Sequence, residues 1–246
     1  MRFIIADILA FFAEFKRIMI DGERYMLIVD GLKNTFIITF GALAIGVVIG
    51  IVVAAIRTSF DKNKESMKLR GGAGYYILLV LNAISKFYLT VTRGTPVVVQ
   101  LMIWYFVILV AAEDIPIAIV AFGLNSGAYV AEIFRGGIMS IDNGQFEAGR
   151  SLGFSYFQTM RYIVIPQTIK STLPTLLNEL IALFKETSIA GYVGILDLTK
   201  AGERIRGITF EAFMPLIVVA IVYLVTVMLL TKIVAVIERR LRRNER

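Results

Sequence analysis

The sequence predicts an all-α membrane protein with five transmembrane helices, and its composition is the first support for this prediction. Of the 246 residues, 57% are hydrophobic and only 18% are charged, with a mean hydropathy of +0.75. Soluble domains are roughly 45–50% apolar and about 25% charged. Backbone groups inside lipid must form their hydrogen bonds internally, so the apolar segments are expected to be helices.

Five segments are long enough to cross a hydrocarbon core of roughly 30 Å, which takes about 20 residues. The predicted spans lie at about 31–56, 75–112, 117–139, 168–189 and 213–237. In the first, Gly46 and Gly50 form a GxxxG pattern that permits close helix contact. The second should bend near Pro96, because proline removes a backbone donor; alternatively, 75–92 is a separate interfacial helix. The fourth is the least apolar, since it contains Glu179 and other charged residues.

The first 27 residues are expected to form an amphipathic helix that lies in the membrane interface. Their polar side chains line one helical face. These are Asp7, Glu14, Arg17 and Asp21. No cleavable signal peptide is expected, because Arg2 is followed by a charged stretch without a small-residue cleavage site.

Basic residues gather on one side of the predicted bundle. They occur in 57–74, in 140–167 and in the basic tail 239–246, whereas the turn after the second span carries Glu113 and Asp114. Lys and Arg accumulate in cytoplasmic loops, so this side should be the cytoplasm and the N-terminus should be outside. The net charge of +7 then reflects orientation, and no nucleic-acid partner is expected.

The sequence offers few residues that could carry out enzyme catalysis. It contains no cysteine and no histidine, which removes thiolate ligands, the commonest metal ligand and the commonest general base. Ser85 and Lys86 are adjacent and point about 100° apart on a helix, so they do not readily form a dyad. We therefore expect no catalytic residues and no metal site, and no P-loop of the form G-x-x-x-x-G-K-[ST] occurs.

The segment 140–167 lies between the third and fourth predicted spans and should form two short helices. Asp142 or Asn143 can cap the first, which covers Gln145 to Leu152, and Gly153 suits its C-terminal end. Ser155 can cap the second, and Pro166 marks the entry to the next span. The segment is either a solvated connecting loop or an amphipathic element that docks into a soluble partner.

The sequence of this segment, "GQFEAGRSLGFSYFQTMRYIVIPQ", resembles the conserved cytoplasmic loop of ABC importer permeases. Gly149 replaces the third residue of the E-A-A motif and Ile165 replaces a leucine. The matching residues are Glu147, Ala148, Gly153, Ile163 and Pro166. Three further stretches resemble the polar-amino-acid branch of these permeases, which takes up histidine, arginine and glutamine. They read "TRGTPVVVQLMIWYF", "LNSGAYVAEIFRGGI" and "NELIALFKETSI".

The resemblance covers about residues 28–243 and implies a type I ABC importer permease in a bacterial cytoplasmic membrane. It implies a second permease subunit, identical or paralogous, two cytoplasmic ATP-binding subunits and an extracytoplasmic amino-acid-binding protein. The helix after Glu147 would be the coupling helix, which sits in a groove of the ATP-binding subunit. The implied coupling residues are Glu147, Ala148, Gly149, Gly153 and Pro166. No cofactor is expected in this chain, because ATP and magnesium would be bound by the partner subunit.

Polar side chains at membrane depth are expensive and usually face a cavity or another polar group. Those predicted to contact an amino-acid substrate are Thr95, Gln100, Asn125, Ser126, Tyr129, Asn178 and Glu179. The Glu179 carboxylate could meet a substrate ammonium group, or it could pair with Lys86 or Arg93. Glu132 and Arg135 are spaced i, i+3 and are expected to form a structural ion pair.

Other readings remain open at this point. The chain could carry another small solute, or it could be a secondary transporter driven by an ion gradient, although no inverted repeat is evident. A scaffold would leave the 140–167 motif unexplained. The segment 190–212 is too polar to span and is expected to be an outer re-entrant or surface helix, with Asp197 and Glu203 accessible to a binding protein.

Overall fold

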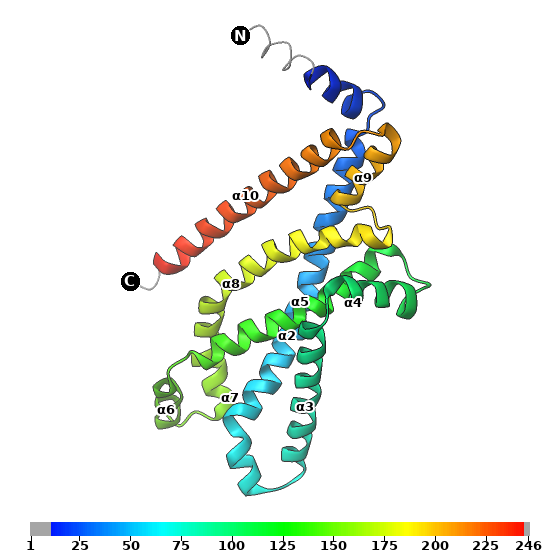
Figure 1. Cartoon of the computed structure of the whole chain (residues 1–246). Helices are drawn as coiled ribbons and strands as arrows, with labels where there is room; N and C mark the ends of the chain where they lie inside the picture. The colour runs from blue at the N-terminus through cyan, green and yellow to red at the C-terminus, as the bar shows by residue number, and fades with distance from the viewer. Residues whose placement is uncertain (1–10, 244–246) are drawn as a thin grey trace.

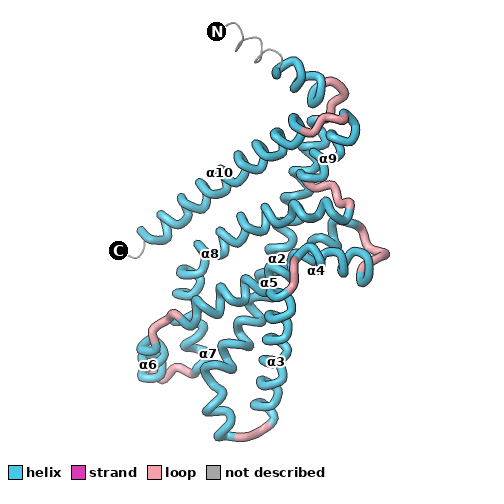
Figure 2. Tube along the Cα trace, viewed as in Figure 1, coloured by secondary structure: helices cyan, strands magenta, loops and turns pink. Residues whose placement is uncertain are grey.

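The computed structural model describes residues 11–243, and every regular element in this range is helical (Figures 1 and 2). The order is η1 (Lys16–Ile20), α2 (Tyr25–Arg70), α3 (Ala73–Gly94), α4 (Val97–Ile103), η2 (Trp104–Ile108), α5 (Asp114–Met139), α6 (Asn143–Ser151), α7 (Tyr156–Thr159), η3 (Met160–Val164), α8 (Ile165–Glu186), η4 (Thr187–Val193), α9 (Leu198–Thr209) and α10 (Phe213–Arg243). The prediction of an all-α protein is confirmed. Of the expected N-terminal amphipathic helix, residues 1–10 lie outside the described part, and residues 11–20 are helical.

The longest helix is α2, and four other α-helices pack against it. It has 46 residues and contains no proline, so it is about 69 Å long. It contacts α3, α5, α8 and α9. Its apolar part ends near Ile56, and the remaining residues to Arg70 are mostly polar. The first predicted span is therefore only the central part of a helix that continues at both ends.

The second predicted span consists of two helices that meet at a break. Helix α3 ends at Gly94, Thr95 is extended with φ −120° and ψ 146°, and Pro96 precedes α4. Proline disfavours the helical conformation of the residue before it, which explains the interruption. Figure 1 shows α4 leaving α3 at a sharp angle. The chain thus changes direction where the sequence predicted a bend.

Small residues bring α5 and α2 close together. A Cβ atom on Gly46 would lie 3.2 Å from the backbone nitrogen of Gly127, and one on Gly50 would lie 2.5 Å from Val130 Cγ1. The GxxxG pattern of α2 therefore supports a close contact, as predicted. Around this contact lies a buried apolar core that includes Ile38, Ala42, Leu101, Ala118, Ala121 and Phe122.

The segment between α8 and α10 is a packed helix rather than a free linker. Helix α9 buries Leu198, Ala201 and Ile205 in a cluster with residues of η1, α2 and α10. Figure 1 shows α9 beside the N-terminal part of α2 and the start of α10, while the rest of α10 extends away from the bundle.

Four described helices are long and apolar enough to cross a membrane: Tyr25–Leu69, Ala73–Gly94, Asp114–Met139 and Phe213–Leu241. Helix α8 has the length of a span, with 22 residues, but it carries several charged side chains. Hydropathy alone therefore misses α8, the fourth of the five predicted spans. The reason lies in polar groups such as Glu179, which pack against α5 as described below.

Candidate functional site

Helix α6 is fixed at both ends by local hydrogen bonds. The Asp142 side chain accepts a hydrogen bond of 2.6 Å from the Gly144 backbone nitrogen and caps the N-terminus. At the other end, Gly153 has φ +79° and donates to the Arg150 carbonyl oxygen, while Phe154 donates to the Gly149 carbonyl oxygen. These are the two bonds of a Schellman motif. The cap predicted at Asp142 or Asn143 is Asp142, and Gly153 stands where the sequence predicted it.

The second short helix is capped at Ser155, as predicted, and runs without a break into α8. The Gln158 backbone nitrogen donates to Ser155 Oγ, and the Ser155 nitrogen donates to Gln158 Oε1, which makes a capping box. Pro166 is the second residue of α8 and directly follows the π-helical turn η3. Helix α7 is therefore joined to α8 in one continuous helical segment.

Gly149 holds α6 against α7. Its backbone is buried, and a Cβ atom there would lie 2.6 Å from Thr159 Oγ1 and 2.8 Å from Thr159 Cγ2. A small residue is therefore required at this point of the motif. In contrast, Glu147 and Ala148 are exposed on the surface of α6 and free to meet a partner.

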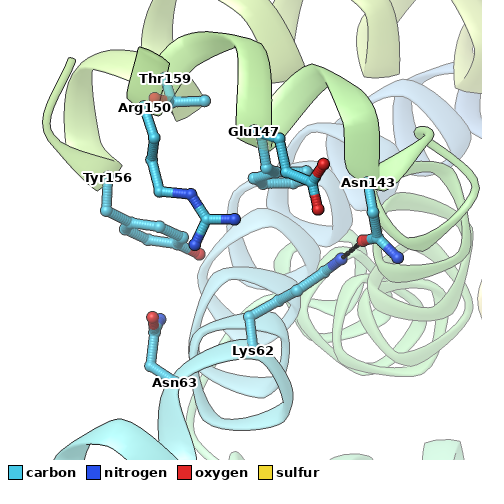
Figure 3. Close-up of a pocket in the computed structure, with 8 residues that line it drawn as sticks. Lys62, Asn63, Asn143, Glu147, Arg150, Tyr156 and Thr159 are labelled. Atoms are coloured by element: carbon cyan, nitrogen blue, oxygen red, sulfur yellow. Dashed lines mark hydrogen bonds between the residues drawn. The ribbon is translucent and has the colours of Figure 1, made fainter. Parts of the chain in front are cut away.

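A polar pocket of about 350 Å³ lies between α6 and the C-terminal extension of α2, which is defined here as residues 57–70 (Figure 3). Lys62 Nζ donates a hydrogen bond of 2.9 Å to Asn143 Oδ1 and lies 4.5 Å from the centre of the Phe146 ring. The pocket is lined by Lys62, Asn63, Asn143, Phe146, Glu147, Arg150, Tyr156 and Thr159.

Lys62 and Asn63 were not predicted as part of this site. They are about 80 residues away from Asn143 in the sequence. The only signal was the change from apolar to polar residues inside one long helix.

Three of the predicted substrate residues form one hydrogen-bond network at the break between α3 and α4. Gln100 Nε2 lies 2.8 Å from Thr95 Oγ1, 3.1 Å from the Thr95 carbonyl oxygen and 2.7 Å from the Thr92 carbonyl oxygen. Asn125 Nδ2 donates to Gln100 Oε1 over 3.1 Å. The backbone carbonyls freed by the helix break are thus bound by a polar side chain of the next helix.

Glu179 and Ser126 form a second contact beside this network. Ser126 Oγ donates a hydrogen bond of 2.9 Å to Glu179 Oε1, which joins α5 to α8. Tyr129 lies one turn further along α5, with its ring 5.9 Å from the Arg93 guanidinium carbon. Asn178 does not join the group, because it is exposed and its amide donates to the Pro174 carbonyl oxygen.

The alternative that Glu179 pairs with Lys86 or Arg93 is not what the structure shows. No ion pair joins Glu179 to either base within the described range. Arg93 instead approaches Glu132 at 3.7 Å. The predicted Glu132–Arg135 pair is present at 3.9 Å.

This ion pair extends onto α2. Arg135 Nη2 lies 3.2 Å from Asp61 Oδ2. Together with the Arg93–Glu132 contact, the charges connect α3, α5 and α2 at the end of the bundle that carries α6.

The prediction for the segment 190–212 is corrected in one respect. Asp197 was expected to be accessible, but it is 0% exposed and caps α9 by accepting a hydrogen bond of 2.8 Å from the Lys200 backbone nitrogen. Burial raises the pKa of the Asp197 carboxyl to about 6. Nearby, Asn34 Nδ2 donates to the Leu196 carbonyl oxygen and Leu198 donates to Thr35 Oγ1, so α2 is bonded to this segment. Glu203 remains partly exposed.

A bundle of long apolar helices, with a polar cluster inside it and a rigid surface helix at one end, defines a membrane permease. Residues 71–243 match the family described as binding-protein-dependent transport system inner membrane component, and the chain belongs to this family. Members are permease subunits of ABC transporters, so the protein is a multi-pass component of the cytoplasmic membrane. As a class, these permeases work with an ATPase and a substrate-binding protein.

Curated relatives cover most of the chain. A putative glutamine transport system permease protein GlnP of Rickettsia typhi is 34% identical over 222 residues, covering 89% of this chain and 94% of that protein. The glutamine transport system permease protein GlnP of Escherichia coli K12 is 36% identical over 221 residues, covering 88% and 93%.

Solved structures have the same fold. The chain is similar to one in a crystal structure of an amino acid ABC transporter with histidines, with a TM-score of 0.76, 34% identity and coverage of 90% of this chain and 98% of that one. It also resembles the inward-facing MetNI methionine ABC transporter, with a TM-score of 0.73 and 21% identity over 88% and 97%. The protein has the type I importer permease fold with five transmembrane helices.

Proposed function

We propose that this permease carries polar amino acids into the cell: glutamine, or cationic amino acids such as arginine, histidine and lysine. Two ATP-binding subunits, which hold ATP and magnesium, drive the transport, and a second permease subunit, identical or paralogous, completes the pathway. An extracytoplasmic binding protein delivers the substrate. The relatives named as glutamine permeases and the likeness to an amino acid transporter support this substrate class.

In this proposal the substrate passes the polar cluster between α4, α5 and α8. Ser126 satisfies one oxygen of Glu179, which leaves the other oxygen to accept a hydrogen bond from a substrate ammonium or amide group. Gln100 and Asn125 add further polar groups, and Tyr129 adds an aromatic face. Asn178 contributes least, because its side chain points back to its own helix.

The single observation that carries the coupling role is the way α6 is held. It is capped at both ends and packed on α7 through Gly149, and α7 is continuous with α8, while Glu147 and Ala148 are exposed. A partner that binds and displaces α6 would therefore displace α7, and with it α8 and the polar cluster. Alternating access then follows from tilting of the membrane helices, with the N-terminus outside and α6 in the cytoplasm.

The test is reconstitution of the permease with its ATP-binding subunit in vesicles, with loaded binding protein on the outer side. ATP hydrolysis and uptake should both rise when the binding protein is added. Glu147→Lys should abolish this stimulation while the protein remains inserted, and Glu238→Lys, the same charge change near the end of α10, should not. Unchanged uptake in Glu147→Lys would refute the coupling role, and uptake that follows an ion gradient without ATP would support a secondary transporter instead.

A further inference from the structure

The C-terminal extension of α2 lies directly beside α6, the proposed coupling helix. Lys62 is bonded to Asn143 in the first turn of α6. Beyond Lys62 the helix continues for eight residues to Arg70, which is about 12 Å. A protein that covers the exposed face of α6 therefore also meets this extension.

The pocket between the two elements has unused positive charge. Figure 3 shows the Lys62 ammonium, the Arg150 guanidinium and the Glu147 carboxylate pointing toward the same space. None of these three groups forms an ion pair within residues 11–243. An ammonium has three donors, of which Asn143 takes one, and a guanidinium has five. Two bases against one carboxylate favour an anionic ligand.

A buried hydroxyl in the same pocket lacks a partner. Thr159 is 2% exposed, and its Oγ1 forms no hydrogen bond in the described part of the chain. Buried polar groups in native proteins are nearly always hydrogen-bonded, so this hydroxyl is an unsatisfied donor in the wall of the pocket.

The surroundings of the pocket indicate that the anion belongs to a protein. Tyr156, which lines the pocket, is 39% exposed. Leu152 and Phe157, in the same segment of the chain, are 71% and 70% exposed. Exposed apolar and aromatic side chains near a polar centre are typical of protein interfaces. A free inorganic anion would gain nothing from these side chains.

We propose that the C-terminal extension of α2 is a second docking element for the ATP-binding subunit, and that an acidic side chain of that subunit inserts between Lys62 and Arg150. This inference rests on the proposed function, because it assumes that the subunit docks on α6. The inference adds α2 to the elements that the ATP-binding subunit contacts.

The direct test treats the intact complex with a zero-length carbodiimide, which joins an amine to a carboxylate. Mass spectrometry should find Lys62 linked to an aspartate or glutamate of the ATP-binding subunit. Lys62→Arg should abolish the link but keep the subunit bound, because the charge stays and the reactive amine is lost. Lys64, exposed two residues further along α2, should not be linked and serves as the matched control. A link at Lys64 but none at Lys62 would overturn the proposal.

Affinity measurements on purified complexes provide the second arm. Lys62→Glu and Arg150→Glu should each weaken binding of the ATP-binding subunit by about tenfold or more, and more strongly at low salt. Lys64→Glu and Arg161→Glu, at exposed positions outside the pocket, should change it less than about twofold. Equal effects in all four variants would refute the proposal.

A bulky substitution on α6 separates this inference from the proposed function. If Ala148→Trp releases the subunit while Lys62→Glu does not, docking on α6 stands and the role of α2 fails. If neither releases it, both fail.

Discussion

Ser126 Oγ donates a 2.9 Å hydrogen bond to Glu179 Oε1 and so connects α5 with α8 inside the bundle. The two residues are 53 positions apart, and Glu179 forms no ion pair with a basic side chain in the described range. A carboxylate held by a hydroxyl rather than by a base keeps its charge available for a ligand.

Glu179→Gln should therefore weaken uptake of cationic amino acids more than uptake of neutral ones. The amide keeps the hydrogen bond from Ser126 but loses the charge, and a hydrogen bond to a charged group contributes roughly 1.5–3 kcal/mol. Transport of labelled arginine and glutamine in vesicles measures the difference, with Ser126→Ala as the variant that keeps the charge. Equal losses for both substrates would make Glu179 a structural residue.

Gly149→Ala should destabilise the protein and loosen α6. The new methyl group would overlap Thr159, and overpacking of this kind costs about 1–3 kcal/mol. The double variant Gly149→Ala with Thr159→Ala removes both overlapping atoms and should recover the melting temperature in detergent. If the double variant is as unstable as the single one, contact with Thr159 is not the reason for the glycine.

Gly50→Ala should separate α2 from α5. Its Cβ atom would press on Val130 and on the Ala131 backbone nitrogen, at 2.9 Å from the latter. A loss of about 1–3 kcal/mol is expected. Gly136→Ala is the matched control on α5, because no atom lies within 4 Å of its Cβ position, and it should be neutral or stabilising by about 0.5–1 kcal/mol. Thermal unfolding of both variants in the same detergent decides the matter.

Stability should rise as the pH falls from about 7 to 5, through Asp197. Its pKa of about 6 in the folded protein exceeds the value of about 3.9 in an unfolded chain, so the folded state binds the proton more tightly. The contribution is complete below pH of about 4 and is lost as the pH rises through about 6, and the change between pH 7 and 5 is about 1 kcal/mol.

Asp197→Asn separates this titration from the cap. Asparagine caps helices about as well as aspartate, so the variant should be more stable than the natural protein at pH 7.5 and should lose the pH dependence assigned to residue 197. Asp197→Ala should be less stable at all pH values, since the bond to Lys200 is lost. A pH profile that Asp197→Asn leaves unchanged would contradict the assignment.

Local chemistry made much of the segment 140–167 predictable. Asp142, Gly153 and Ser155 act on residues within a few positions of themselves, so their roles follow from residue type and spacing. The break at Pro96 is likewise local. These features need no knowledge of how distant helices pack.

Contacts between distant segments could not be predicted from the sequence. Nothing in the pattern showed that Lys62 faces Asn143, that Gly149 meets Thr159, or that Asp61 joins Arg135. Asp197 was misjudged because a charged residue in a polar segment is usually exposed, whereas here it caps α9 with its side chain buried. Burial of a single carboxylate depends on tertiary packing that residue type does not reveal.

The length of α2 has a mechanical consequence. Near one end, Thr35 accepts a hydrogen bond from Leu198, and near the other, Lys62 donates one to Asn143. The 27 residues between them measure roughly 40 Å, so a rotation of about 10° about the midpoint moves each bonding point by roughly 3.5 Å in opposite directions. With no proline to act as a joint, α2 would move as one body, and a displacement at one bonding point would be accompanied by an opposite displacement at the other.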